Sequence, residues 1–374
     1  MINNICLLTW DYPTPTDPVY SFVEQLCIEF ANNGADVTVI APQSLTSKLL
    51  HRKAIRPKFT SHSYGASVVM VYQPYYITLP YKYKRINDYL YSCAAKRVVK
   101  KLKTKFDVAY AHFWTPGFIA YKLFNKDKLP LYIATGESDI SNMFSFNRRI
   151  ESFKEYVTGV IAVSSKNKEE SISLNLTTEN KVRVFPNAID NTLFYKRDKI
   201  QCRRELGLKE DIFIVAFVGW FIDRKGSKRV ARAIEMAGDD IFSIFIGEGE
   251  DDPDCGNIIF KGKLPHNQIP IYLNAADVFV LPTKKEGCCN AVIEAMACGL
   301  PIISSDLSFN WDVLNKTNSI LVNPENIDEI AAAIRALRGN NPLRAKLSEG
   351  AIESAKNLTI QQRAKSIMDF MDSN

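Results

Sequence analysis

The sequence is poor in residues that could build a metal centre or a disulfide framework. It contains only four histidines, and its eight cysteines show no C-x-x-C spacing. Cys288 and Cys289 are neighbours in the chain, which is a poor geometry for an ordinary disulfide. We therefore expect no metal site and a reducing, cytoplasmic location.

Long apolar runs and targeting signals are also missing. No run reaches the roughly 18 residues that a membrane-spanning helix needs. The first eight residues, Met-Ile-Asn-Asn-Ile-Cys-Leu-Leu, lack the basic segment of a secretory signal. No G-x-G-x-x-G follows the first apolar run of either half, which disfavours a NAD-dependent dehydrogenase.

Positive charge is concentrated in the first half of the chain. Residues 1–190 hold 24 Lys and Arg against 16 Asp and Glu, whereas the remainder holds 23 against 25. The densest basic stretch, Lys82–Lys105, has nine basic residues, three tyrosines and one acid, Asp88, and a fourth tyrosine, Tyr81, directly precedes it. It suits an anionic membrane surface, although a solvated helix face explains it equally well. No recognition motif accompanies the charge, so a nucleic-acid partner is not expected.

Short apolar runs alternate with amphipathic segments along the whole chain, a pattern typical of α/β domains with parallel sheets. Thirteen strands are predicted, too many for one Rossmann unit and too many for a (β/α)8 barrel. We predict two Rossmann-like doubly wound domains, residues 1–188 and 189–357, divided in the turn-rich segment Pro186–Asp190. The strands are expected at residues 5–9, 37–41, 68–72, 108–112, 131–135, 160–163, 182–185, 213–219, 242–247, 258–261, 278–281, 301–304 and 320–322.

The ends of the strands in the second half carry loops suited to a ligand. Doubly wound domains bind ligands outside the carboxyl ends of their strands, so we expect a substrate in a cleft between the two halves. The loops at Gly219, Gly247 and Gly262, together with the loop at residues 282–290, should line one rim of that cleft. A plain tight turn explains the glycines as well.

The most informative stretch is E-G-C-C-N-A-V-I-E-A-M-A-C-G-L-P, residues 286–301. Asn290 is a plausible N-cap of a helix that stops at Gly299. Glu286 then lies in the loop and Glu294 in the helix, while backbone N–H groups of residues 287–291 can bind an anion. Carboxylates accept hydrogen bonds from vicinal hydroxyls, so the layout predicts a phosphate flanked by two hydroxylated rings. A solvated loop acid and a charge at a helix start are the alternatives.

This stretch resembles the E-x7-E signature of retaining family 4 glycosyltransferases, which have the GT-B fold. The resemblance implies that Glu286 contacts the hydroxyls of the donor sugar and that Glu294 contacts the ribose. The other residues of the loop expected to bind the donor are Gly287, Cys288, Cys289 and Asn290. The alternative interpretation of three cysteines, Cys288, Cys289 and Cys298, is that they pack as small apolar residues. Residues 217–226, 246–249 and 259–262 resemble further parts of the family, with the nucleobase against the Gly262 loop. The segment containing Asn187 is similar to the family's interdomain P-N-G-V-D-x3-F, and Asn187 is expected to bind the donor.

The positive charges expected to neutralise a diphosphate depart in part from the family pattern. Trp220 stands where the family often has Arg, whereas Lys225 matches the family's Lys. Arg224 is the candidate for the missing charge, although the sequence does not fix its direction. Neutralisation matters because charge grows on the leaving diphosphate as the C–O bond breaks. As an alternative, Lys225 is a solvated residue at a helix start, where its charge would oppose the helix dipole.

The first half is expected to bind the acceptor, but it resembles the family less. Residues 11–18, with Ser21, replace the usual glycine-rich loop, and the usual His-Gly becomes Thr135-Gly136-Glu137. His112 is therefore the alternative catalytic histidine, with a structural histidine as the competing interpretation. Tyr20, Trp114, Gly136 and Glu137 are expected on the acceptor side. The resemblance also implies that a C-terminal helix, residues 358–374, packs back on this domain.

The resemblance implies transfer of a sugar from a nucleoside diphosphate sugar to a hydroxyl, with retention of configuration and no metal or other cofactor. The expected setting is bacterial surface polysaccharide, capsule or glycolipid assembly. The acceptor would be a glycan or lipid-linked glycan, at the inner face of the membrane. Two alternatives remain open at this point: a nucleotide-sugar epimerase or phosphorylase of the same fold, and a non-catalytic nucleotide-sugar-binding subunit. The intact Glu286, Glu294 and Lys225 favour turnover.

Overall fold

The computed structural model of the chain describes residues 2–14, 20–50, 55–141 and 150–373. The chain forms two compact units. Unit 1 contains the chain up to Val163, Asn167–Phe185 and the chain from Arg363 onward, and unit 2 contains Ser164–Lys166 and Pro186–Gln362. Over the described ranges, no helix combines the length and the apolar character needed to cross a membrane.

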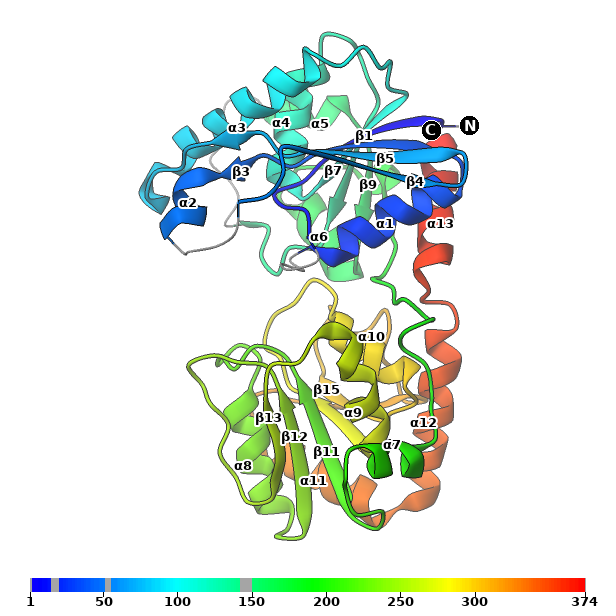
Figure 1. Ribbon diagram of the computed structural model, residues 1–374. Helices are drawn as coiled ribbons and strands as arrows, with labels where there is room; N and C mark the ends of the chain where they lie inside the picture. The colour runs from blue at the N-terminus through cyan, green and yellow to red at the C-terminus, as the bar shows by residue number, and fades with distance from the viewer. Residues whose placement is uncertain (1, 15–19, 51–54, 142–149, 374) are drawn as a thin grey trace. The chain divides into compact units, whose positions relative to one another are not determined.

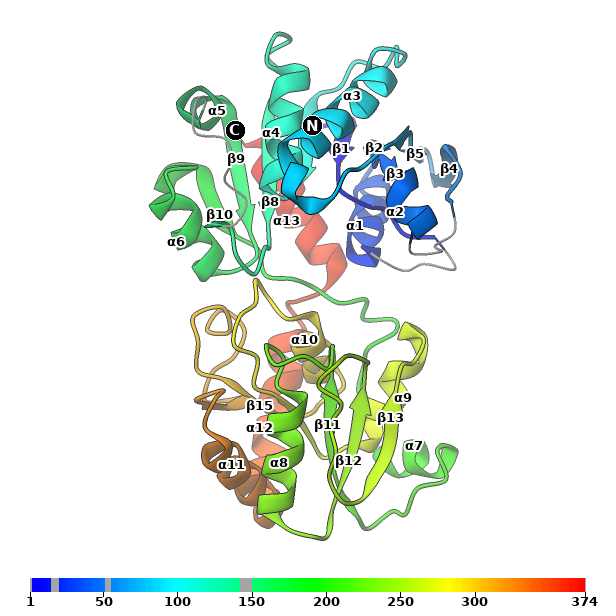
Figure 2. The same ribbon diagram turned by 90° about the vertical axis from the view of Figure 1, so that its left-hand side faces the viewer.

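Unit 1 is built on an eight-stranded sheet with seven parallel strands (Figures 1 and 2). Its order, β10-β9-β8-β7-β1-β2-β5-β4, reverses direction beside β1, as in doubly wound Rossmann folds. All seven strands predicted in this half are confirmed. They are β1 (Asn4–Leu8), β2 (Asp36–Ile40), β5 (Ser67–Tyr72), β7 (Val108–His112), β8 (Leu131–Thr135), β9 (Val157–Ala162) and β10 (Val182–Val184).

Three further strands in unit 1 were not predicted. β4 (Phe59–Tyr64) forms an antiparallel hairpin with β5 at the edge of the sheet, across a turn at Gly65 (φ +60°). Its sequence, F-T-S-H-S-Y, is mostly polar and its side chains are mostly exposed, so it lacks the apolar run of a buried strand. The short strands β3 (Gln43–Ser44) and β6 (Tyr75–Tyr76) pair separately.

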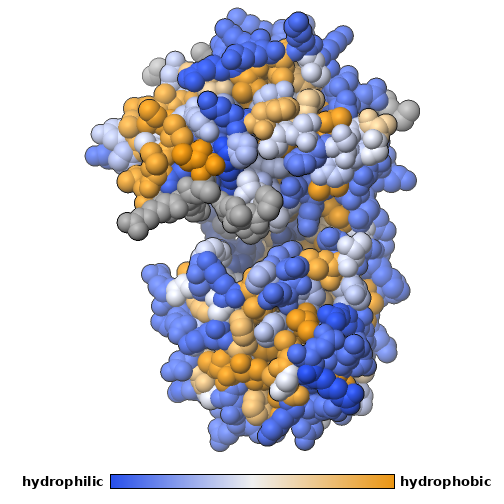
Figure 3. All heavy atoms as spheres, in the orientation of Figure 1, coloured by the Kyte–Doolittle hydropathy of each residue, from blue (hydrophilic) through white to orange (hydrophobic). Residues whose placement is uncertain are grey.

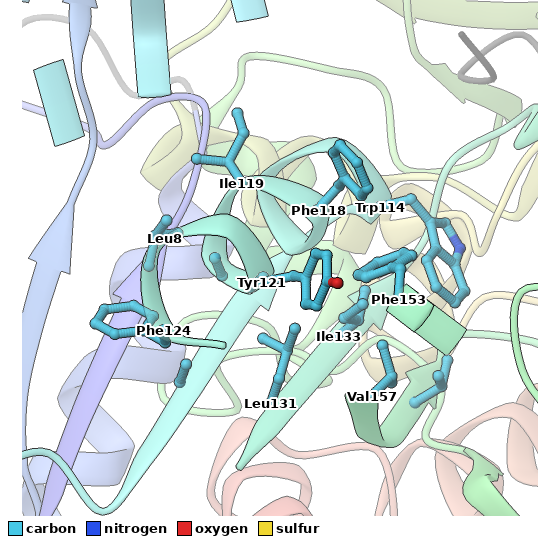
Figure 4. Packing of buried hydrophobic residues seen from close by; sticks show 14 of the residues in the cluster. Leu8, Trp114, Phe118, Ile119, Tyr121, Phe124, Leu131, Ile133, Phe153 and Val157 are labelled. Carbon is cyan, nitrogen blue, oxygen red and sulfur yellow. The ribbon is translucent and has the colours of Figure 1, made fainter. Parts of the chain in front are cut away.

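Helices cover both faces of the unit 1 sheet. On one face, Leu131 and Ile133 of β8 join a cluster with aromatic residues of α4 (Trp114–Phe124) and Phe153 of α5 (Ile150–Tyr156) (Figure 4). Tyr132 points to the other face, because successive side chains of a strand alternate. There its ring meets Phe370 of α13 (Ile360–Asp372). Its hydroxyl donates to the carbonyl oxygen of Met371, 3.0 Å away. The other helices of unit 1 are α1 (Ser21–Asn32), α2 (Leu45–Leu50), α3 (Lys84–Val99) and α6 (Ser165–Ser173).

Unit 2 contains a six-stranded, fully parallel sheet in the order β13-β12-β11-β14-β15-β16. This is the Rossmann order, with the reversal between β11 and β14. All six predicted strands are confirmed, so the expected α/β class with two doubly wound domains is correct. The strands are β11 (Phe213–Val218), β12 (Ile241–Ile246), β13 (Ile258–Gly262), β14 (Val278–Leu281), β15 (Ile302–Ser305) and β16 (Ser319–Val322).

The helices of unit 2 also divide between two faces, because crossovers that run in opposite directions along a parallel sheet emerge on opposite sides. α8 (Ser227–Ala237) packs with α11 (Ile327–Gly339) on one face. On the other face α9 (Ile269–Ala275) packs with α7 (Lys199–Glu205), and α10 (Asn290–Ala297) packs with α12 (Asn341–Ala355) (Figure 1). The loops that follow the strands are thereby left at one edge of the sheet.

Candidate functional site

The loops after β11, β12 and β13 lie side by side at the carboxyl edge of the unit 2 sheet. The amide of Gly219 donates to the carbonyl of Ile246, and the amide of Gly247 donates to the carbonyl of Gly262. Gly247 has φ +154°, and a Cβ placed on it would lie 1.9 Å from the carbonyl oxygen of Gly219. Only glycine fits at this approach, so Gly247 does more than complete a tight turn.

Glu286, in the loop after β14, is the centre of a charged cluster. One of its oxygens, Oε1, lies 2.5 Å from Nη1 of Arg224 and 2.7 Å from Nζ of Lys225. The same oxygen accepts a 2.9 Å hydrogen bond from the buried hydroxyl of Thr283. All three contacts use Oε1, and Oε2 has no protein donor within the described ranges. The sequence singled out Glu286, Arg224 and Lys225 separately, and the structure brings them together.

Arg224 contacts the backbone of the loop after β14 as well as the Glu286 carboxylate. Its Nη1 also donates to the carbonyl of Lys285, and its own carbonyl accepts from the amide of Lys284. These bonds fix the loop after β14 to the loop after β11. Two cations and one carboxylate leave the cluster with a formal charge of +1.

The ammonium of Lys225 is held in its charged form although its side chain is buried. Burial alone would lower its pKa, but the interactions with the Cys289 sulfur and with the negatively charged Glu286 outweigh burial, so the pKa of Lys225 is raised. Nζ of Lys225 lies 3.9 Å from Sγ of Cys289. Burial in turn raises the pKa of the Cys289 thiol. Lys225 is therefore a fixed positive charge beside the start of α10.

The start of α10 offers backbone donors without a side-chain cap. The expectation that Asn290 is the N-cap is wrong: the capping position is Cys289, with extended backbone, and Asn290 is the first helical residue. Asn290 is turned aside because its Oδ1 accepts from Nδ2 of Asn187, which also donates to the carbonyl of Cys288. Within the part of the chain described, the amides of Gly287, Cys289 and Ala291 donate to no protein acceptor. Unpaired amides at a helix start attract an anion.

The C-terminal stop of α10 is as expected. The amide of Gly299 donates to the carbonyl of Met296, and the amide of Leu300 donates to that of Ala295, which is the Schellman arrangement. Gly299 takes φ +78°, which suits glycine at this position. Cys298 and Cys288 are buried, as expected for small apolar residues.

Glu294, on α10, has a partner that sequence analysis missed. Its Oε1 lies 3.0 Å from Nε2 of His266, which begins the 3-10 turn η4 (His266–Gln268) after β13. The hydrogen bond to Glu294 is the main cause that raises the pKa of His266, and burial only partly opposes it. The two residues are 28 positions apart in the sequence, and no spacing rule could have predicted the pair.

A pocket opens next to these loops. It has a volume of about 210 Å³ and is lined by the Gly219 and Gly247 loops, Trp220, Lys263, Leu264 and Ile269. Trp220 is 57% exposed, and Nζ of Lys263 lies 5.8 Å from the centre of its ring. Lys263 also pairs with Glu248. The Trp220 position, where the resemblance expected Arg, thus presents a flat aromatic face instead of a charge.

The candidate residues of unit 1 form a separate group, and the structure corrects several of them. His112 is buried between the rings of Phe22 and Phe113, at 5.0 and 4.5 Å. Burial and the positive charge of Arg363 lower the pKa of His112 to about 3. An enclosed ring with so low a pKa stays neutral near pH 7, which favours the structural interpretation of His112 over the catalytic one.

Glu137 and Trp114 also have structural surroundings. The Glu137 carboxylate accepts from the amides of Trp114 and Gly136 and from the hydroxyl of Thr135, at 2.7–3.0 Å. Burial raises the pKa of Glu137, and those hydrogen bonds oppose the shift. Glu137 thus caps the start of α4. Trp114 is 2% exposed and belongs to the core cluster, so it does not line an acceptor pocket (Figure 4).

Tyr20 and Gly136 remain near the surface of unit 1. Tyr20 packs edge-on against Phe113, with ring centres 6.0 Å apart, and is only partly exposed. Burial, followed by the charge of Glu137, raises the pKa of Tyr20 to about 12. The replaced glycine-rich loop of residues 11–18 lies in part outside the described residues. Its Asp11 pairs with the buried Arg56.

Two protein-family models match the chain, one on each part. The model described as Glycosyltransferase Family 4 matches residues 19–193, and the model Glycosyl transferases group 1 matches residues 198–354. A Bacillus subtilis protein, described as the teichuronic acid biosynthesis glycosyltransferase TuaC, is 29% identical over 351 residues, 88% of each chain. The UDP-Gal:alpha-D-GlcNAc-diphosphoundecaprenol alpha-1,3-galactosyltransferase of Escherichia coli is 27% identical over 57% of this chain and 59% of its own.

Solved structures are similar over almost the whole chain. Sucrose-phosphate synthase from Thermosynechococcus elongatus aligns with a TM-score of 0.79 at 19% identity, covering 99% of this chain and 98% of that one. HepE from Anabaena, in complex with UDP and glucose, aligns with a TM-score of 0.72 at 16% identity, covering both chains completely. The structural likenesses confirm the GT-B fold. Together with the family models and the relatives, they make the chain a glycosyltransferase, as expected.

Proposed function

We propose that this GT-B glycosyltransferase moves a sugar from a nucleoside diphosphate sugar to a hydroxyl acceptor, with retention of anomeric configuration. The observation that carries the proposal is the group of Glu286, Arg224 and Lys225 beside the uncapped start of α10. A net positive charge and unpaired amides suit a diphosphate, and the carboxylates on either side suit hydroxylated rings.

The diphosphate is proposed to lie between Lys225 and the amides of residues 287–291. Glu294, one turn into α10, would then accept from the ribose hydroxyls, with His266 holding the carboxylate in place. The base would occupy the pocket beside Trp220 and Leu264, directly after the Gly262 loop. The related protein HepE was solved with UDP and glucose, and the E. coli relative is named for UDP-Gal, so a uridine nucleotide is the first donor to test.

Glu286 is proposed to orient the donor sugar through Oε2, since Oε1 already serves Thr283 and the two cations. In the transfer step the bond between the anomeric carbon and the phosphate oxygen breaks. A bond to the acceptor oxygen forms on the same face of the sugar, and the acceptor proton passes to the leaving phosphate. Lys225 and the backbone amides stabilise the growing charge on that phosphate. No covalent enzyme intermediate and no divalent metal are required in this scheme.

The acceptor is proposed to be a glycan or lipid-linked glycan, handled by unit 1 at the cytoplasmic face of the membrane during surface polysaccharide assembly. This part of the proposal is supported by the relatives, one named for teichuronic acid and the other for a diphosphoundecaprenol acceptor. Tyr20 and Gly136 are the remaining candidates for acceptor contacts. The basic stretch Lys82–Lys105 supports a peripheral location.

Thermal denaturation with a panel of nucleoside diphosphate sugars tests the donor part. A ligand at 100 times its dissociation constant should add about 2.7 kcal/mol to the free energy of unfolding. The stabilising donor is then incubated with lipid-linked acceptors, with and without EDTA, and the anomeric configuration of the product is read by NMR. An inverted product, or loss of activity in EDTA, would contradict the mechanism. Binding without any transfer would instead indicate a non-catalytic subunit.

A further inference from the structure

Exposed hydrophobic side chains are concentrated on one surface of unit 1. Of the thirteen large hydrophobic residues exposed in the described part of the chain, nine lie between residues 49 and 89, and the other four are scattered over unit 2. Leu50 is 81% exposed and Tyr89 is 66% exposed. We call six of the nine the apolar ridge: Leu49, Leu50, Ile77, Leu79, Ile86 and Tyr89.

Hydrogen bonds hold the three segments of the apolar ridge together. Thr46 of α2 accepts from the amide of Thr78 and donates to its carbonyl, at 2.8 and 2.9 Å. Asn87 of α3 accepts from the amide of Leu79 and donates to its carbonyl, at 2.8 and 2.9 Å. These bonds link the start of α2, residues 77–79 and the start of α3 into one surface, and Figure 3 shows hydrophobic side chains gathered over this region.

The chain around the apolar ridge is almost free of negative charge. Residues 37–106 contain fourteen Lys and Arg but a single acid, Asp88. Asp88 pairs with Lys84 at 3.5 Å, and burial raises the pKa of its carboxyl. The stretch of sequence that supplies most of the exposed apolar side chains is thus also rich in basic residues and poor in acids.

Helix α3 carries both properties on one face. Its exposed side chains recur with helical spacing, so that they form a single stripe along the helix. The stripe begins with Ile86 and Tyr89 and continues with Lys96, Arg97 and Lys100, all exposed. The sixteen residues of α3 span about 24 Å at 1.5 Å per residue. The basic end of the helix therefore extends the surface beyond the ridge and leaves the apolar side chains at its start uncovered.

We propose that the apolar ridge inserts into the surface of an anionic lipid bilayer, while the basic end of α3 rests on the headgroups. A bilayer of this kind offers both an apolar interior and a negative surface, which matches the two properties of α3. Monomeric proteins rarely leave large hydrophobic side chains clustered in water, so the ridge needs a covering partner. The inference deepens the proposed function, because a lipid-linked acceptor would be met at that surface.

Flotation with vesicles tests the insertion. The whole protein is mixed with phosphatidylcholine vesicles, with or without phosphatidylglycerol, at low salt and at about 1 M salt, where the screening length is only about 3 Å. Leu50→Ser, Ile77→Ser and Ile86→Ser are combined in one variant. Tyr195→Ser, Met236→Ser and Trp311→Ser, all exposed in unit 2, form the matched control. A third variant carries Lys96→Gln, Arg97→Gln, Lys100→Gln and Lys101→Gln.

Wild type and the unit 2 control should float with anionic vesicles, and part of that binding should survive high salt. The ridge variant should lose the salt-resistant part, by roughly tenfold for each inserted side chain. The Gln variant should lose mainly the low-salt part. Equal flotation of wild type and the ridge variant would overturn the proposal. A second outcome would also overturn it: neither protein floats, the wild type self-associates, and the ridge variant does not. The ridge would then join two copies of this chain.

Stabilisation by UDP is measured on every variant, so that a misfolded protein is recognised. The ridge lies outside the donor site, and its variant should keep the wild-type response to UDP. Flotation without any sugar transfer would support the membrane insertion and contradict the proposed function. Transfer to a detergent-solubilised lipid acceptor by a protein that never floats would do the reverse.

Discussion

Glu286 serves two sets of partners with its two oxygens. Oε1 is engaged by Arg224, Lys225 and Thr283, and the carboxylate reduces the local charge from +2 to +1. The same residue can therefore hold the phosphate-binding cations in place and still offer Oε2 to a sugar. A substitution of Glu286 should therefore affect sugar binding and diphosphate binding differently.

Glu286→Ala should abolish most sugar transfer but should leave the affinity for free UDP unchanged or slightly raised. The sugar loses its acceptor, whereas the diphosphate meets two cations without a competing carboxylate. Calorimetric titration with UDP and turnover with the full donor measure the two effects. Glu286→Gln is the matched variant, since it keeps the shape and loses the charge. Strong loss of UDP affinity in both variants would contradict this division of roles.

Glu294→Ala should weaken UDP binding instead, by about 1.5–3 kcal/mol, because the ribose loses a charge-assisted acceptor. The same titration measures it, with uridine added as a second ligand to isolate the ribose and base. The exposed Glu353→Ala in α12 is the control. An effect on sugar choice with unchanged uridine binding would assign Glu294 to the sugar.

The hydrogen bond between His266 and Glu294 should make stability depend on pH. The pKa of His266 is raised in the folded state, so its contribution is fully present below the unfolded value near 6.5. It is lost as the pH rises through the folded pKa. The melting temperatures of wild type and His266→Ala should therefore differ most near pH 5 and approach each other near pH 9. Asn267→Ala, in the same turn, should give a difference independent of pH, and a His266 difference that grows with pH would refute the assignment.

The carboxyl edge of the unit 2 sheet depends on how closely two loops approach. Gly247→Ala places a methyl group 1.9 Å from the carbonyl oxygen of Gly219, so one of the loops must move. We expect a loss of about 1–3 kcal/mol of stability, together with weaker UDP binding. Denaturant unfolding with and without UDP measures both. Gly256→Ala, where no atom lies within 4 Å of the added Cβ, should be nearly neutral. Equal behaviour of the two variants would show that the close approach is unimportant.

The strands that were predicted contain an unbroken apolar run, and those that were missed do not. Buried parallel strands such as β11 read as unbroken apolar runs because both faces are covered. β4 is an exposed edge strand with a polar sequence, so no run marks it. Site residues followed the same division. Glu286 and Glu294 lie eight apart in one motif, whereas the position of His266, the direction of Arg224 and the burial of Trp114 depend on contacts between distant segments.

The whole molecule should melt as two units, because each has its own sheet and core. Phe370→Ala removes ring contacts with Tyr132 and Phe185 in unit 1, which should cost that unit about 3–5 kcal/mol. Scanning calorimetry should show one transition lowered by the substitution and another raised by UDP. Met236→Ala, exposed in unit 2, should leave the first transition in place. One transition that responds to both changes would mean that the units unfold together.

Because of helix α13, unit 2 can complete its folding before unit 1 during synthesis on the ribosome. The amide of Ile2 donates to the carboxylate of Asp372 at 2.9 Å, so segments from both ends of the sequence meet in unit 1. Synthesis usually lets the N-terminal domain fold first. Here unit 2 has all its residues once Gln362 has emerged, but unit 1 still waits for the rest of α13. Until then the side of Tyr132 that meets Phe370 stays uncovered, and a chaperone that acts on the nascent chain would find its site there.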